Sequence, residues 1–243
     1  MHKPLSDAVS RGDIYIAYQP IVDLTTGGTF GYEALARSAV PAWRGPLELI
    51  AAAVDTHCMG ELGRALRQMA IAGCQTHPLF INLHPSEFDA EWLVRPDDAI
   101  TTHPHDIYLE ITESVPISHY RFCRSVLTEI RGKGIKLAVD DLGAGYSNLK
   151  YIADLSPEAV KLDRELITGI TRESRLHKLV TAIVRLCSDL GAAVVAEGIE
   201  TDVELRAVIA TGAQYGQGYF LARPAAEPPS VNSYAGFGKA SRL

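Results

Sequence analysis

The chain has 243 residues, of which 47% are hydrophobic and 21% charged, a composition typical of a soluble protein with a substantial core. Its net charge of −6 argues against a protein that coats DNA or RNA polymers through charge alone. No apolar run approaches the roughly 18 residues of a membrane span, and the amino terminus lacks the apolar segment of a signal peptide. We therefore expect a cytoplasmic protein with no membrane segment.

Two strands are predicted near the amino terminus, over residues 14–22 and 30–37, with a turn at 25–28 between them. Pro20 lies inside the first strand and cannot donate a ladder hydrogen bond, so we expect a bulge or a sheet edge there. A helical region follows over 47–73, where apolar residues recur at helical spacing. We expect this region to break near Gly60.

From residue 80 onward, short apolar strands alternate with helical patterns. The expected strands cover residues 80–83, 107–113, 136–139, 158–163, 193–197 and 215–219. Helices are expected over 119–131, from about 149, over 175–190, and after a capping box formed by Thr201 and Glu204. The stretch after Pro224 has no periodicity, so we expect residues 225–243 to form a loose tail.

Eight strands with helices between most of them, in a chain of this length, indicate an α/β protein with a TIM-like (β/α)8 barrel. A doubly wound open sheet is the alternative. A closed barrel gathers the carboxyl ends of its strands around one mouth, whereas an open sheet would leave the outer strands too far apart to share a site. Eight polar residues at or near such ends, two of them on the same strand, therefore favour the barrel: Glu33, Asn82, Glu110, Asp140, Asp141, Lys161, Glu197 and Gln217.

The adjacent acids Asp140 and Asp141 end a buried strand. Two neighbouring carboxylates repel each other and lose hydration there, which is costly unless cations neutralise them. Gly143 and Gly145 follow, so the backbone can approach a ligand closely. A simple turn would explain one aspartate and one glycine, but not the pair together with matching acids on other strands. We interpret this stretch as half of a divalent-metal site.

The polar residues at the strand ends also indicate which metal is bound. Carboxylate and amide oxygens are hard ligands that suit Mg²⁺ or Mn²⁺ better than zinc. One of the two adjacent acids is expected to bridge two metals, an arrangement that suits in-line phosphoryl displacement. Lys161 could orient or activate the attacking water, although a buried salt-bridge partner is the commoner role for such a lysine. The expected ligands are Glu33, Asn82, Glu110, Asp140 and Asp141.

The stretch from Glu33 to Arg37, EALAR, resembles the signature of the EAL-domain cyclic di-GMP phosphodiesterase family. Three letters alone are weak, but further family motifs follow in order over roughly residues 5–224, so we expect a single EAL-type domain over 1–243 with its core in that range. The other motifs are YQPIV at 18–22, Asn82 before Pro85, EITE at 110–113, DDLGAGYS at 140–147, VKLDR at 160–164, AEGIE at 196–200 and QGY at 217–219.

The resemblance implies a barrel whose first strand runs antiparallel to the others. It also implies hydrolysis of one phosphodiester bond of cyclic di-GMP to give linear pGpG, with two Mg²⁺ or Mn²⁺ ions. Ca²⁺ is expected to support binding but poor catalysis. The implied roles are one metal held by Glu33, Asn82, Glu110 and Asp140, the second served by Asp141, and a hydrolytic water positioned by Lys161 and Glu197 with Gln217 nearby.

The resemblance further implies contacts to the dinucleotide from Gln19, Leu35 and Arg37, the last through phosphate. Glu113 would brace the loop over 140–147, positioned by Gly143 and Gly145, which in the family couples metal binding to dimerisation. A homodimer is therefore expected near the helix after this loop. Lys161 and Arg37 are the cations expected near the site, so ligand binding should depend strongly on metal.

Three residues depart from the family pattern. Leu142 replaces the usual Phe, Ala144 replaces the usual Thr, and His84 stands where a small polar residue is common. None is an expected metal ligand, so we expect them to tune rate or dimer coupling.

Two alternatives remain open. A catalytically weak or inactive cyclic di-GMP receptor would typically lose part of the EAL signature, the acidic pair or the lysine, all of which this chain retains. A protein-interaction module would have no need of Gln19 and Arg37. The sequence does not say which signal the enzyme answers to, and the chain is either a stand-alone enzyme or the catalytic domain of a longer protein.

Overall fold

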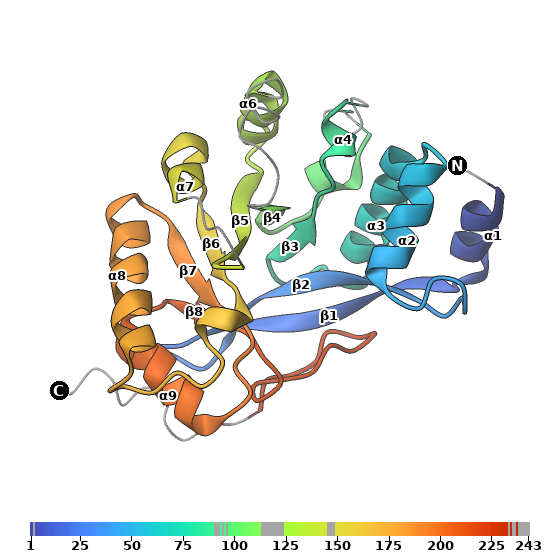
Figure 1. Ribbon diagram of the computed structural model, residues 1–243. Coiled ribbons are helices and arrows are strands. Elements are labelled where there is room, and N and C mark those ends of the chain that lie inside the picture. Colours follow the sequence, from blue (N-terminus) through green and yellow to red (C-terminus); the bar gives the residue numbers. More distant parts are fainter. Residues whose placement is uncertain are drawn as a thin grey trace.

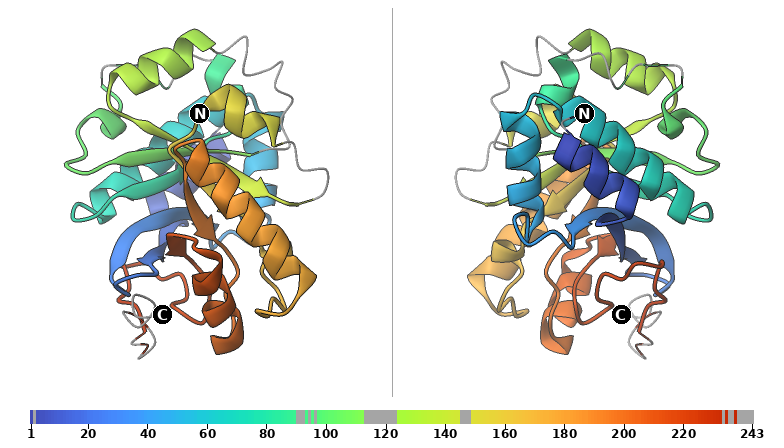
Figure 2. Two further views of the ribbon diagram at one scale, coloured as in Figure 1. Left: turned by 90° about the vertical axis from the view of Figure 1, so that its left-hand side faces the viewer. Right: turned by 90° about the vertical axis from the view of Figure 1, so that its right-hand side faces the viewer.

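The computed structural model describes residues 1, 3–89, 93, 95, 97–112, 124–144, 149–232, 234 and 237. Within these residues the strands close into a barrel in the order β1 to β8, and Figures 1 and 2 show the larger helices outside it. The predicted β/α barrel is confirmed. None of the described helices combines the length and hydrophobicity that crossing a bilayer requires.

The eight predicted strands are all present, although the last is shorter than expected. They are β1 (Ile14–Asp23), β2 (Thr29–Ser38), β3 (Leu79–Asn82), β4 (Ile107–Thr112), β5 (Lys136–Leu142), β6 (Ala159–Leu162), β7 (Ala193–Ala196) and β8 (Tyr215–Gly216). The α-helices are α1 (Lys3–Arg11), α2 (Pro46–Asp55), α3 (Met59–Gly73), α4 (Ser86–Asp89), α6 (Arg124–Gly132), α7 (Lys150–Leu155), α8 (Arg175–Asp189) and α9 (Asp202–Thr211). The 3₁₀ helices in the described part of the chain are η1 (Ala99–Thr101) and η2 (Arg164–Leu166).

Most helix boundaries follow the sequence patterns. The break in the first helical region falls at residues 56–58, slightly before Gly60, where His57 adopts a left-handed backbone with φ of 54°. Thr201 and Glu204 form the predicted capping box of α9. The helices α1 and α4 were not predicted, and the described part of the helix expected over 119–131 is α6.

Strand β1 runs antiparallel to both neighbours, while β2 to β8 are parallel. The backbone N–H and C=O of Tyr18 both bond to Ala225 and therefore point away from β2. Since backbone groups alternate along a strand, Pro20 also turns its nitrogen away from β2, and its missing N–H does not interrupt that ladder. Of the two expected alternatives, a bulge or a sheet edge, the structure shows the edge: Pro20 pairs with Tyr32 of β2, while β8 pairs with β1 only at Val22 and Asp23.

The segment after Pro224 is held along this edge of β1, where Figure 1 shows the red end of the chain running beside the strand. Ala225 forms an isolated bridge with Tyr18, and the Tyr32 hydroxyl donates to the carbonyl of Pro229 at 3.0 Å. The backbone N–H of Asn232 donates to Leu221 at 2.9 Å. The expectation of a loose tail is therefore wrong for residues 225–232. The tail can bind here because β1 pairs with β8 through only two residue pairs, which leaves other backbone groups of β1 free to bond to the tail.

The barrel interior is filled by a small apolar cluster that forms the floor of the mouth. Its largest members, Phe80 and Tyr108, stack with ring centroids 4.2 Å apart. A separate, larger cluster lies between the strands and the helices and includes the alternate residues Leu109 and Val139. The floor cluster comprises Ile21, Phe80, Tyr108, Ala138, Ala159 and Val195, with Phe30 and Tyr215 packed against it.

A buried ion cluster joins α3 to the segment after β3. The guanidinium of Arg67 bonds to Glu87 and, through Nη2 at 3.0 Å, to Asp98, and all three side chains are about 1% exposed or less. Glu87 Oε1 in turn accepts the backbone N–H of His84 at 3.1 Å. The cluster thus ties α3, α4 and η1 together behind the strand that carries Asn82.

We expect the Arg67→Leu variant to lower the free energy of unfolding by about 3–5 kcal/mol, because it leaves two buried carboxylates without their cation. Urea denaturation measures this difference. Arg64→Leu is the matched control on the same helix, since Arg64 pairs with the solvent-exposed Asp97 and its loss should change stability far less. Equal stability of the two variants would contradict a structural role for the buried cluster.

Candidate active site

The pleat of the strands explains how the functional side chains reach the mouth. Side chains alternate along a strand, so residues two apart face the same side. Seven residues that form the floor or pack against it are therefore each followed, two positions nearer the mouth, by a polar residue that also points into the barrel. The pairs are Ile21 and Gln19 on the reversed strand β1, then Phe80 and Asn82, Tyr108 and Glu110, Ala138 and Asp140, Ala159 and Lys161, Val195 and Glu197, and Tyr215 and Gln217.

Lys161 lies at the centre of this polar layer and is fully buried. Its Nζ is 2.7 Å from Oε1 of Glu110 and 2.7 Å from Oε1 of Glu197. It is also 3.2 Å from Oδ1 of Asp140 and 3.3 Å from Oε1 of Glu33. Apart from these ion pairs, Nζ, both Glu110 oxygens and Asp140 Oδ1 have no hydrogen-bond partner within the described residues.

The carboxylates form two clusters that share one member. Oxygen atoms of Glu33, Glu110 and Asp140 lie within 4.8 Å of one another, and so do those of Asp140, Asp141 and Glu197. The Asn82 amide adjoins the first cluster, since its Nδ2 donates to Glu33 Oε1 at 3.2 Å. Hard oxygen donors, several of them buried without hydrogen-bond partners, fit Mg²⁺, Mn²⁺ or Ca²⁺. The predicted ligands are therefore brought together, with Asp140 placed where it could bridge.

The pKa values of these carboxyl groups are not all shifted in the same direction, because burial raises them while neighbouring charges and hydrogen bonds lower them. It raises the pKa of Glu110 well above its ordinary value, and the charge of Lys161 offsets only part of this. Burial likewise raises the pKa of Glu197 to about 8 and that of Asp141, with help from Asp140, to about 6. For Glu33, burial is outweighed by Lys161 and by hydrogen bonds from Gln217 and Asn82, and its pKa is lowered.

Lys161 itself remains charged. Burial alone would lower its pKa, but Asp140, Glu110, Glu197 and Glu33 together raise it well above the ordinary lysine value. Its ammonium group can therefore donate hydrogen bonds but cannot serve as a base. Both roles considered for Lys161, salt-bridge partner and water-orienting group, are compatible with this position.

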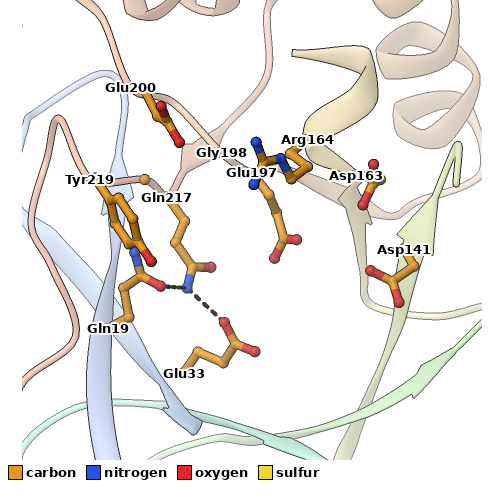
Figure 3. Close-up of a pocket in the computed structure, with 11 residues that line it drawn as sticks. Gln19, Glu33, Asp141, Asp163, Arg164, Glu197, Gly198, Glu200, Gln217 and Tyr219 are labelled. Atoms are coloured by element: carbon orange, nitrogen blue, oxygen red, sulfur yellow. Dashed lines mark hydrogen bonds between the residues drawn. The ribbon is translucent and has the colours of Figure 1, made fainter. Parts of the chain in front are cut away.

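The backbone directs both adjacent aspartates into the mouth. Successive strand residues normally face opposite sides, but the ladder between β5 and β6 shifts register between Val139 and Leu142. Within this irregularity Asp141 adopts a left-handed conformation with φ of 59°, which is uncommon for a residue other than glycine. Figure 3 shows the Asp141 carboxylate directed toward Glu197 across the pocket.

A chain of amides orients Glu33 from the opposite wall (Figure 3). Gln217 Nε2 donates to Glu33 Oε2 at 2.6 Å and lies 3.1 Å from Gln19 Oε1. Gln19 Nε2 donates in turn to the carbonyl of Ala222 at 3.3 Å. Gln217 and Gln19 therefore anchor Glu33 to the chain segment after β8, and their contact with a dinucleotide stays a prediction.

The polar layer opens into a pocket of about 300 Å³. Arg164, from the turn after β6, lies on its wall near Glu197 (Figure 3), so the expectation of only Lys161 and Arg37 as nearby cations was incomplete. The VKLDR motif contained Arg164, but a strand pattern does not say where a side chain beyond the strand end will point. Pocket-lining residues to which the sequence analysis assigned no role are Asp163, Arg164, Gly198, Glu200, Gly218 and Tyr219.

The remaining expected residues lie elsewhere. Leu35 and Arg37 continue along β2, and the Arg37 guanidinium donates to the carbonyl of Ala36 at 2.9 Å; neither residue lines this pocket, and their contact with a dinucleotide stays a prediction. Glu113 and Gly145 lie outside the described residues.

The residues that depart from the family pattern are all described. Leu142 is buried and keeps an apolar anchor. Ala144 donates its backbone N–H to Asp141 at 3.1 Å. His84 Nδ1 accepts the backbone N–H of Ser86 at 3.2 Å.

The raised carboxylate pKa values make the stability of the metal-free protein depend on pH. Glu197 titrates near pH 8 when folded but near pH 4.3 in an unfolded chain. Between these values the folded state holds a proton that the unfolded state has released, so stability should fall as the pH rises from about 5 to 8. Urea unfolding in EDTA measures this slope. Glu197→Gln should flatten it, whereas the control Glu200→Gln, at an exposed carboxylate on the same pocket, should not; an unchanged slope in Glu197→Gln would contradict the assignment.

Comparison with known proteins identifies a matching family and two similar relatives. The EAL domain family model matches residues 2–224. Cyclic di-GMP phosphodiesterase PA2567 of Pseudomonas aeruginosa is 35% identical over 90% of this chain and 40% of its own length. Cyclic di-GMP phosphodiesterase RocR of the same organism is 31% identical over 90% of this chain and 59% of its own. The chain thus spans less than two thirds of either relative.

Solved structures share the fold. A PaMucR phosphodiesterase in complex with c-di-GMP has a TM-score of 0.78 and 28% identity, covering 93% of this chain and 96% of its own. Klebsiella pneumoniae BlrP1 in a calcium/cy-diGMP complex has a TM-score of 0.78 and 30% identity, covering 90% of this chain and 58% of its own. With the barrel and the ordered polar layer described above, these matches show that the chain belongs to the EAL domain family.

Proposed function

We propose that this chain is a metal-dependent phosphodiesterase that hydrolyses one phosphodiester bond of cyclic di-GMP to give linear pGpG. The observation that carries the proposal is Asp140, shared by two carboxylate clusters at the mouth of a closed barrel. A shared carboxylate between two oxygen-rich clusters suits two divalent ions and an in-line displacement at phosphorus. The names of the two Pseudomonas relatives support the choice of substrate.

The residues would divide between the two ions. Glu33, Asn82, Glu110 and Asp140 would hold the first Mg²⁺ or Mn²⁺, and Asp140 and Asp141 the second, with Glu197 beside it. When bound, such ions lower the pKa of a coordinated water and offset charge that develops on the phosphoryl oxygens.

The protein's own groups would prepare the attack. Lys161 stays protonated, so it would orient a water by donating a hydrogen bond. Glu197, 2.7 Å from Lys161, would accept the water's proton. Gln217 and Gln19 hold Glu33 in place, and the aromatic floor of Phe80 and Tyr108 closes the barrel beneath the reacting groups.

The charge of the pocket explains why substrate binding would require metal. Seven acidic side chains form the polar layer or line the pocket, opposed by Lys161 and Arg164 among the described residues of those two sets. An anionic dinucleotide would be repelled from this mouth unless divalent cations reverse the local field. Arg164 would then bind a phosphate from the turn after β6.

Nucleotide chromatography after incubation with cyclic di-GMP tests the proposal. With Mg²⁺ or Mn²⁺ we expect pGpG, with EDTA none, and with Ca²⁺ binding but little product, because its looser coordination positions water less well. Asp140→Asn should lower the rate by about a hundredfold or more, since metal charge stabilisation is worth several kcal/mol. Asp189→Asn, at an exposed acid on α8, is the control. Tight metal-independent binding of cyclic di-GMP without product would instead favour a receptor.

We also infer a homodimer formed near α7, as the family resemblance implies. Leu149, at the start of this helix, is 42% exposed and offers an apolar contact for a two-fold interface. Sedimentation velocity should show a dimer for the wild type and a shift toward monomer for Leu149→Arg. Leu47→Arg, at an exposed leucine on the distant helix α2, should leave the dimer intact. A wild-type protein that sediments as a monomer at full specific activity would exclude this role.

A further inference from the structure

The short helix η2 occupies the space between the two loops that carry the second carboxylate cluster. It follows β6 directly, whereas Asp141 lies at the end of β5 and Glu197 at the end of β7. In Figure 3 the residues of this turn, Asp163 and Arg164, lie between Asp141 on one side and Gly198 on the other. The two acids come from β5 and β7, which are not neighbours in the barrel, and β6 with η2 at its end lies between them.

Two glycines mark the points where η2 touches the neighbouring loops. A Cβ at Gly143 would lie 2.5 Å from Cδ1 of Leu166, and a Cβ at Gly198 would lie 2.5 Å from Cβ of Arg164. Both glycines have positive φ, +111° and +72°, so a side chain is disfavoured there by conformation as well as by space. Leu166 therefore packs directly on the backbone after Asp141, and Arg164 on the backbone after Glu197.

The turn is itself held firmly. Its preceding residue, Asp163, donates its N–H to Leu142 on β5 at 3.0 Å, and its carboxylate accepts the N–H of Glu165 at 2.7 Å. Ile167 and Ile170, just after the turn, are fully buried. Glu204 Oε1 accepts the N–H of Gly169 at 2.8 Å and so connects this segment to the capping box of α9. Because η2 is held at both ends, it can fix the distance between the two loops that it separates.

We propose that η2 is a spacer that sets the separation of Asp141 and Glu197, and that Leu166 is the positioning residue for the second metal cluster. This inference rests on the proposed function, because it requires the cluster of Asp140, Asp141 and Glu197 to bind a divalent ion. A leucine side chain has no group that could coordinate a metal, so Leu166 acts through the backbone. It supports the backbone at Gly143, two residues after Asp141, and so holds the left-handed turn that points this carboxylate inward.

Titration of the full chain with Mn²⁺ alone, followed by calorimetry, tests the spacer. The wild type should bind two Mn²⁺ ions. Leu166→Ala should weaken the second by about ten- to a hundredfold, the range seen when groups that orient metal ligands are removed, while the first stays within about twofold. Leu166→Met, which keeps most of the volume, should restore the second site. Leu176→Ala is the matched control, since Leu176 is a half-buried leucine of α8 that also packs on the main core.

Urea unfolding in EDTA is recorded for the same variants. The two alanine variants should lose comparable stability, so a selective loss of the second Mn²⁺ in Leu166→Ala reflects position and not general destabilisation. Two Mn²⁺ ions bound with wild-type affinity by Leu166→Ala would overturn the spacer and leave the proposed function standing. A wild type that binds fewer than two ions would overturn the two-metal function and the spacer with it.

Discussion

The contact between the Lys161 ammonium and four surrounding carboxylates is the interaction on which the site depends. One positive charge faces Glu33, Glu110, Asp140 and Glu197 in a place that water barely reaches. One ammonium group cannot balance the charge of four carboxylates. The raised pKa values of Glu110 and Glu197 mean that the metal-free protein reduces this excess negative charge by retaining protons. Divalent ions would relieve the same excess without protons. Charge that is costly to bury in the free protein is therefore what prepares the site for metal, and Lys161 keeps the carboxylates close while the ions are absent.

The positions of these carboxylates and of Lys161 could be predicted from sequence because they depend on two regular features of the fold. The pleat places residues two apart on one face, and parallel strands in a closed barrel present their carboxyl ends together. Glu110 and Lys161 could thus be assigned to one mouth although 51 residues separate them in the sequence. The antiparallel first strand obeys the same rule in reverse, which is why Gln19, before Ile21, joins the layer. For such positions the hydrophobic pattern and the strand end contain all the information that is needed.

Other parts of the structure could not be predicted, because they depend on contacts that leave no periodic pattern in the sequence. Arg164 lies one residue past Asp163, where side-chain direction follows the dihedral angles of a single 3₁₀ turn. Arg67 occupies an ordinary position in the pattern of α3, yet it is buried because Glu87 and Asp98, from two later segments, meet it there. The segment after Pro224 lacks a strand pattern and is ordered by backbone groups that β1 leaves unpaired. Each of these depends on a partner distant in sequence.

Asp141 shows how local strain and function are connected in this barrel. A left-handed backbone costs a residue with a Cβ about 1–2 kcal/mol, and glycine would relieve that cost. Glycine would also remove one of the three carboxylates of the second cluster. An ordinary strand residue would keep the carboxylate but direct it away from Asp140, since neighbours in a regular strand face opposite sides. Two adjacent acids can serve one site only if the chain departs from the pleat between them. The irregular register of β5, the glycine at 143 and the side chain of Leu166 packed on that glycine together maintain this departure.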